Sequence, residues 1–150
     1  MKHTISVLVK NEPGVLSRIA NLFSGRGYPI ESLTVATTLD ENYAWFTIVT
    51  EGEDTVVEQI IKQVSKLIPV IKVADFSQNS STTFELVFIK VIAHNDLLKI
   101  VEDFGAKIID EAENICTIQA VCKEQQLKKL VESLKAFEIQ DLVRSGAVSI

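Results

Sequence analysis

The stretch KNEPGVLSRIANLFSGRGYPIESLTVA, residues 10–36, decides the fold of this chain. It ends an apolar strand, starts an amphipathic helix and returns through a second turn rich in glycine. Pro13 and Gly14 place little side-chain bulk at the predicted first turn of the helix. The backbone N–H groups of that turn have no intrahelical partner, and the helix dipole favours an anion beside them. The segment therefore predicts a turn that can receive a small anion.

The residues on both sides of this stretch alternate between strand and helix periodicity. Alternating apolar positions predict strands, apolar positions at helical spacing predict helices, and Pro69 ends the second helix. The resulting elements are a strand, a helix, two strands, a helix and a strand, at residues 4–9, 13–24, 30–39, 43–50, 57–68 and 70–76. The order βαββαβ is typical of a ferredoxin-like unit.

The same order returns after a polar segment that has no large apolar residue. The second set of elements lies at residues 84–93, 96–104, 106–110, 115–121, 124–137 and 139–143. We therefore predict an α+β fold of two tandem ferredoxin-like units, at residues 1–76 and 84–150, joined by a linker at 77–83.

Composition narrows the possible partners and compartments. With a net charge of −5 and a pI near 5.1, the chain lacks the clustered basic residues that bind nucleic acid. No apolar run approaches the roughly 20 residues of a membrane span, and the N-terminus is not a signal peptide, so we expect a cytoplasmic protein. Cys116 and Cys122 lie about 20 Å apart along one predicted strand, so we expect reduced thiols in the core.

The first strand–helix turn differs from its counterpart in the second unit. The second turn has Asp96 where the first has a glycine, and a carboxylate there repels an anion. The predicted anion site is therefore in the first unit. An amino acid also needs an acceptor for its ammonium group and a small apolar pocket. The residues available for these roles are Gly14 and Val15 (amides for the carboxylate), Asn11 (acceptor), and Ile30, Leu33 or Val35 (apolar wall).

The remaining side chains that could take part in catalysis or binding form no catalytic pattern. His3 and His94 lie in different units without neighbours for a triad or a metal site, so we expect them at the surface or at a sheet edge. The acidic residues occur at turns and helix ends, which argues against a hydrolytic pair. Tyr43 and Trp45 share one face of a strand that has no basic residue, so packing on a helix or a partner chain is favoured over base stacking.

Three segments carry a resemblance to a known family: NEPGVLSRIANLFSGRGYPIESLTVA, TIVTEGEDTVVEQIIKQVSKLIPVIKV and the closing VRSGAVSI. They resemble the regulatory, or small, subunit of acetohydroxyacid synthase, also called acetolactate synthase, over nearly the whole chain. The resemblance implies an ACT domain at residues 1–76 and an ACT-like domain at residues 84–150, and it implies that the chain is not the catalyst.

The resemblance also implies the partners. In the family this subunit binds and activates the large subunit, which condenses pyruvate with pyruvate or 2-ketobutyrate, and it confers feedback inhibition by valine or a related branched-chain amino acid. Thiamine diphosphate, Mg and FAD are expected on that catalytic partner and no cofactor on this chain. A homodimer with ACT sheets side by side is expected, with the effector at its interface. The alternative is a free-standing ACT-domain sensor of another enzyme or of transcription.

Seven residues lie where the resemblance places the family's effector region. Asn11 and Gly14 match positions tied to effector binding, and Ser17 matches a position linked to feedback sensitivity. Val15 and Leu16 lie beside them at the helix start. Across the interface the family usually has Asn where this chain has Pro29, followed by Ile30. Proline supplies neither a side-chain amide nor a backbone N–H. This departure bears directly on valine sensitivity, or at least on valine affinity.

Overall fold

The computed structural model describes residues 1–77 and 83–150. The chain forms two compact units: the first comprises Met1–Thr83 with Ala147–Ile150, and the second comprises Phe84–Gly146. Apart from its two end residues, the predicted linker at 77–83 lies outside the described residues.

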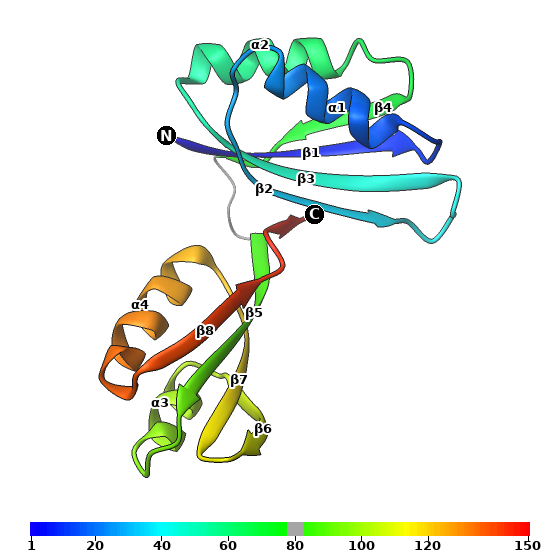
Figure 1. The fold of residues 1–150 in the computed structure, drawn as a ribbon. Coiled ribbons are helices and arrows are strands. Elements are labelled where there is room, and N and C mark those ends of the chain that lie inside the picture. The colour runs from blue at the N-terminus through cyan, green and yellow to red at the C-terminus, as the bar shows by residue number, and fades with distance from the viewer. Residues whose placement is uncertain (78–82) are drawn as a thin grey trace. The chain divides into compact units, whose positions relative to one another are not determined.

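The first unit has the predicted order βαββαβ (Figure 1). Its elements are β1 (Lys2–Lys10), α1 (Val15–Ser24), β2 (Ile30–Thr37), β3 (Tyr43–Glu51), α2 (Asp54–Val64) and β4 (Val70–Asp75). The strands form an antiparallel sheet in the order β2-β3-β1-β4, and both helices cover one side of it. This arrangement confirms the ferredoxin-like prediction for the first unit.

The core of the first unit lies between its helices and one face of its sheet. Apolar residues at every second strand position meet apolar residues at helical spacing, as the two periods require. The buried residues from strands β1 and β3 are Ile5, Val7, Val9, Ala44, Phe46 and Ile48, and those from the helices are Val15, Ile19, Phe23, Val57, Ile60 and Val64. Among the described residues of this unit, no helix lies on the opposite face of the sheet (Figure 1).

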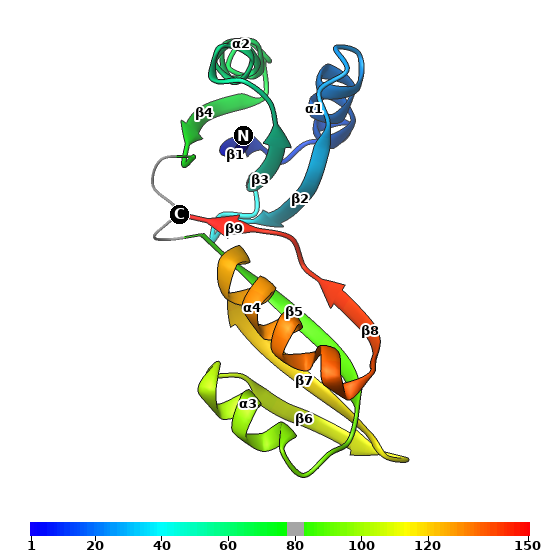
Figure 2. The same cartoon turned by 90° about the vertical axis from the view of Figure 1, so that its left-hand side faces the viewer.

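The second unit repeats the arrangement (Figure 2). Its elements are β5 (Thr83–Ile92), α3 (Leu97–Asp103), β6 (Lys107–Ala112), β7 (Ile115–Cys122), α4 (Glu124–Leu134), a 3-10 turn (Lys135–Phe137) and β8 (Ile139–Arg144). The strand order is β6-β7-β5-β8. The short strand β9 (Val148–Ser149) lies in the C-terminal residues that belong to the first unit. Cys116 and Cys122 are free and buried in this core, which confirms the prediction of core thiols.

Two helices end earlier than the apolar periodicity predicts. Helix α2 ends at Val64, and Ile68, which continues the apolar stripe in the sequence, is 93% exposed. The residue before a proline is biased away from helical backbone angles, so a helix that meets Pro69 ends before it. Helix α4 ends at Leu134 and passes into the 3-10 turn.

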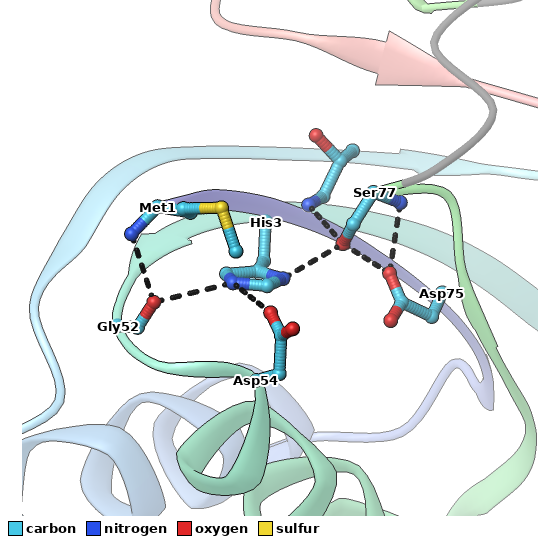
Figure 3. Close-up of polar contacts among 7 residues, drawn as sticks. Met1, His3, Gly52, Asp54, Asp75 and Ser77 are labelled. Carbon is cyan, nitrogen blue, oxygen red and sulfur yellow. Dashed lines mark hydrogen bonds and ion pairs between the residues drawn. The ribbon is translucent and has the colours of Figure 1, made fainter.

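His3 is buried, so the prediction of a surface or edge position is wrong for this residue. Strand β1 is paired on both sides, and only 5% of His3 is exposed. In Figure 3 the ring lies between Gly52 and Ser77, with Nε2 3.2 Å from the Gly52 carbonyl oxygen and Nδ1 3.1 Å from the Ser77 hydroxyl. The Ser77 hydroxyl in turn donates to Asp75. His94 is exposed, as predicted.

Candidate functional site

The turn between β1 and α1 is built around Gly14. This residue is the N-cap of α1 and has a φ of +85°, in the left-handed region that L-residues rarely adopt. A Cβ atom added at Gly14 would meet nothing within 4 Å. Glycine is therefore required by the backbone angle, and the space beside it is open.

The first turn of α1 presents backbone donors without acceptors. Val15 donates its N–H to the Glu12 carbonyl oxygen at 3.3 Å, so this predicted donor is already in use. The N–H groups of Gly14, Leu16 and Ser17 have no hydrogen-bond acceptor among residues 1–77 and 83–150. Leu16 and Ser17 are exposed, so their N–H groups, together with that of Gly14, can receive a carboxylate.

Asn11 is held in place by the β2–β3 hairpin. Its backbone N–H donates to the Asn42 carbonyl oxygen at 2.7 Å, and its side-chain Nδ2 donates to the Glu41 carbonyl oxygen at 2.9 Å. These two bonds leave the Oδ1 atom of Asn11 as an acceptor at the exposed end of the turn. The predicted role of Asn11 as an ammonium acceptor therefore has a suitable geometry.

Three residues at this turn were not assigned from the sequence. Glu41 and Asn42 fix the Asn11 side chain through their carbonyl oxygens, which no side-chain pattern reveals. Arg18 lies one helical turn after Gly14 and forms an exposed ion pair with Glu12 at 3.4 Å. Its position in the NEPGVLSR segment was the available signal, because a cation one turn into the helix lies near an anion at the helix start.

Pro29 and Ile30 do not lie beside Asn11 and Gly14. They follow α1, whereas Gly14 precedes it, and a helix of ten residues is about 15 Å long. The Pro29 carbonyl oxygen accepts a hydrogen bond from the Thr50 hydroxyl at 2.6 Å, and Ile30 packs against the core. One copy of the chain therefore does not bring all seven predicted residues together.

The corresponding turn of the second unit has different chemistry. Asp96 is the N-cap of α3 with a φ of −83°, in the right-handed region, and its carboxylate lies 3.5 Å from His94 Nδ1. Helix α3 has only seven residues. The predicted contrast between a glycine and a carboxylate at the two N-caps is confirmed.

Two further classes of feature are absent from the described parts of the chain. No three His, Cys, Asp or Glu side chains of residues 1–77 and 83–150 lie where they could hold a metal ion. Within the same residues, no helix is long and apolar enough to cross a membrane.

The fold defines a protein of two ferredoxin-like units, and comparison with known proteins assigns the first unit to the ACT type. Residues 5–72 match the family model of the AHAS small subunit-like ACT domain, and residues 84–150 match that of the small subunit of acetolactate synthase. The probable acetolactate synthase small subunit of Archaeoglobus fulgidus is 42% identical, with 100% of this chain and 96% of that protein covered. The acetolactate synthase small subunit of Aquifex aeolicus is 38% identical, with 99% and 80% covered.

A solved structure shows the same similarity. The crystal structure of the acetolactate synthase small subunit from Thermotoga maritima matches with a TM-score of 0.89 and 30% identity, over 100% of this chain and 96% of that one. The chain belongs to the acetolactate synthase small-subunit family. It is a regulatory, non-catalytic subunit of branched-chain amino acid biosynthesis, and this assignment replaces the alternative of a free-standing sensor.

Proposed function

We propose that this chain makes acetolactate synthase respond to valine or a related branched-chain amino acid that binds the first unit. The supporting observation is the turn at Gly14, where helix N–H groups without acceptors lie beside an open space in a chain of this family. By the same proposal the chain binds and activates the large catalytic subunit. That partner, and not this chain, holds the thiamine diphosphate, Mg and FAD.

Each charged end of an amino acid has a matching group at this turn. The carboxylate accepts hydrogen bonds from the N–H groups of Leu16 and Ser17 and is attracted by Arg18, which can exchange its exposed pairing with Glu12 for the ligand. The ammonium group donates to Asn11 Oδ1. The turn therefore suits a zwitterion better than a simple anion.

The site is completed by a second copy of the chain. Pro29 and Ile30 lie at the far end of α1 from Gly14, so they reach the same ligand only from a partner protomer. Strand β2 is at the edge of the sheet, with β3 as its one sheet neighbour among the described strands, and an edge strand can pair with its equivalent in another copy. Leu16 is 47% exposed and Val35 is also exposed, on the elements that would meet.

Feedback follows from differential binding. An amino acid held between two protomers favours the dimer arrangement that binds it more tightly, and this preference alters how the subunit holds the catalytic partner. Equal affinity for the two arrangements would produce no regulation, however tight the binding.

The test is acetolactate formation by the purified catalytic subunit, measured with and without this chain and titrated with valine, leucine and isoleucine. We expect higher activity with the chain, and inhibition by one of the three amino acids only when the chain is present. Full activity of the catalytic subunit alone and no amino-acid response of the mixture would reject the proposal. Co-purification of the two subunits checks that they have assembled.

A further inference from the structure

The helix-free face of the first sheet contains a pocket of about 340 Å³. Every residue that lines it belongs to the first unit, which includes the C-terminal residues Ala147–Ile150. Its floor comes from all four strands, and Val148 and Ile150 form part of its wall. This pocket is separate from the Gly14 turn, because none of the turn residues lines it.

Strand alternation places the lining residues on this face. On β3, Phe46 points into the core between the sheet and the helices, whereas its neighbours Trp45 and Thr47 line the pocket. On β4, Val73 packs against the core and Lys72 lines the pocket. Trp45 therefore does not pack on a helix of its own unit, and one of the two predicted surroundings for this residue is wrong.

Two residues with hydroxyl groups line the floor of the pocket. Ser6 and Thr47 are directly opposite each other on β1 and β3 and are 1% and 4% exposed. Their hydroxyls form no hydrogen bond with any residue of the described segments. The two hydroxyls are not among the fully buried, unpartnered side-chain atoms of the described residues, so they open onto the pocket and can donate hydrogen bonds to a polar ligand atom there.

A lysine lies at the same pocket. The exposed Lys72 makes no ion pair or hydrogen bond with the described residues. The aromatic side chains of Trp45 and Phe76 line the pocket beside it. A ligand that suits these surroundings has a negative group for the lysine and a hydrocarbon part for the aromatic rings.

We propose that this pocket binds a small apolar carboxylate. The carboxylate pairs with Lys72 and accepts hydrogen bonds from Ser6 and Thr47, and the hydrocarbon part contacts Trp45 and Phe76. A volume of about 340 Å³ is at the lower end of the usual range for ligand pockets, which limits the ligand to a small acid. A branched-chain amino acid and the corresponding 2-oxo acid share this chemistry, and the experiment below distinguishes them.

Trp45 gives a direct signal for binding, because it is the single tryptophan of the chain and lines the pocket. The full chain is titrated with valine, with 3-methyl-2-oxobutanoate and with the neutral amide isobutyramide while tryptophan emission is recorded. We expect a saturable change with at least one of the two acids and none with the amide. Whichever acid gives the change identifies the ligand, and no change with either acid would overturn the proposal.

Variants separate this pocket from the Gly14 turn. Lys72→Gln should weaken the binding of the acid about tenfold, since it removes one charge-assisted contact. Lys66→Gln is the matched control, because Lys66 is an exposed lysine outside the pocket. Thr47→Val keeps the side-chain shape and should weaken binding about threefold. Gly14→Asp should leave this signal unchanged. Equal affinity of the Lys72→Gln and wild-type chains, measured by calorimetry, would contradict the proposal.

Discussion

The two units share a backbone arrangement and differ in the side chains placed on it. In the first unit the N–H of Asn11 donates to the Asn42 carbonyl oxygen, and in the second the N–H of Ala93 donates in the same way to Asn114. These bonds join each strand–helix turn to the neighbouring hairpin. At equivalent positions, however, the first unit has an amide side chain and a glycine, and the second has alanine and Asp96.

The other end of the central strand shows a second difference. His3 and Glu85 occupy equivalent buried positions at the starts of β1 and β5, and each is connected to a charged residue of the last strand. His3 reaches Asp75 through the Ser77 hydroxyl. Glu85 accepts two direct hydrogen bonds from Arg144, at 2.7 and 2.8 Å. The first unit thus joins these two positions through a hydroxyl, and the second joins them through a direct ion pair.

The ferredoxin-like backbone sets where polar groups meet in each unit, and the individual residues decide what those groups do there. The first unit has open donors at its turn, which suits a ligand. The second unit has a carboxylate at its turn and a direct ion pair between Glu85 and Arg144, and the ion pair suits a structural role. Four substitutions or conditions test this division of roles.

The largest expected effect is on the stability of the second unit. Arg144→Ala leaves Glu85, which is 4% exposed, without its cation, and we expect a loss of about 3 kcal/mol in the free energy of unfolding. Both cysteines lie in the second unit and the tryptophan lies in the first, so alkylation of the thiols in urea reports the second unit alone. The urea midpoint of Trp45 emission should not move.

Two controls accompany that variant. Arg144→Lys keeps the charge without the paired hydrogen bonds and should be intermediate. Ser77→Ala removes the corresponding link of the first unit and should cost only about 1 kcal/mol, detected by Trp45 emission. A loss below 1 kcal/mol for Arg144→Ala would show that the direct ion pair is not a stabilising feature of the second unit.

The next largest effect is on effector binding by the first unit. Gly14→Asp places a carboxylate where the ligand carboxylate is expected, and like charges in contact cost several kcal/mol, so affinity should fall about a hundredfold. Gly14→Asn is the matched control, because asparagine and aspartate both tolerate the left-handed backbone angle and only aspartate is charged. Calorimetric titration with the amino acid measures both. Similar affinities for the two variants would place the ligand carboxylate elsewhere.

A smaller expected effect is a pH dependence of the stability of the second unit alone. Burial raises the pKa values of the Cys116 and Cys122 thiols. The unfolded chain loses its thiol protons near the ordinary pKa of about 8.5, whereas the folded unit retains them to higher pH. Unfolding therefore releases protons, and the second unit should lose about 1 kcal/mol of stability between pH 7 and pH 9. In a variant with both cysteines changed to alanine, this part of the decrease in stability with pH should be absent. Urea unfolding followed by circular dichroism at each pH measures the stability.

The smallest expected effect is at Pro29. Pro29→Asn restores a side-chain amide and a backbone N–H, and if these groups contact the effector from the partner protomer, affinity should rise about threefold. Calorimetric titration of the wild-type and Pro29→Asn chains with the amino acid measures the two affinities. Equal affinities would remove Pro29 from the proposed site.

Local patterns in the sequence were sufficient for the element order and for the contrast between the two turns. The 3.6-residue and two-residue periods located the helices and strands, and the residue types at Gly14 and Asp96 fixed the chemistry of each turn. They were not sufficient where a residue's surroundings come from distant parts of the chain. The burial of His3, the support of Asn11 by the hairpin and the Glu85–Arg144 pair all join residues separated by at least 30 positions.

The sequence by itself determined two ferredoxin-like units, their core faces and the one turn suited to an anion, because these depend on the spacing and type of neighbouring residues. Only the tertiary structure decided which amides at that turn are without acceptors and that Pro29 lies at the far end of α1. It also decided that Ser6, Thr47 and Lys72 meet around one pocket. The physical reason is strand register, which brings distant residues side by side and is fixed by the packing of the whole unit.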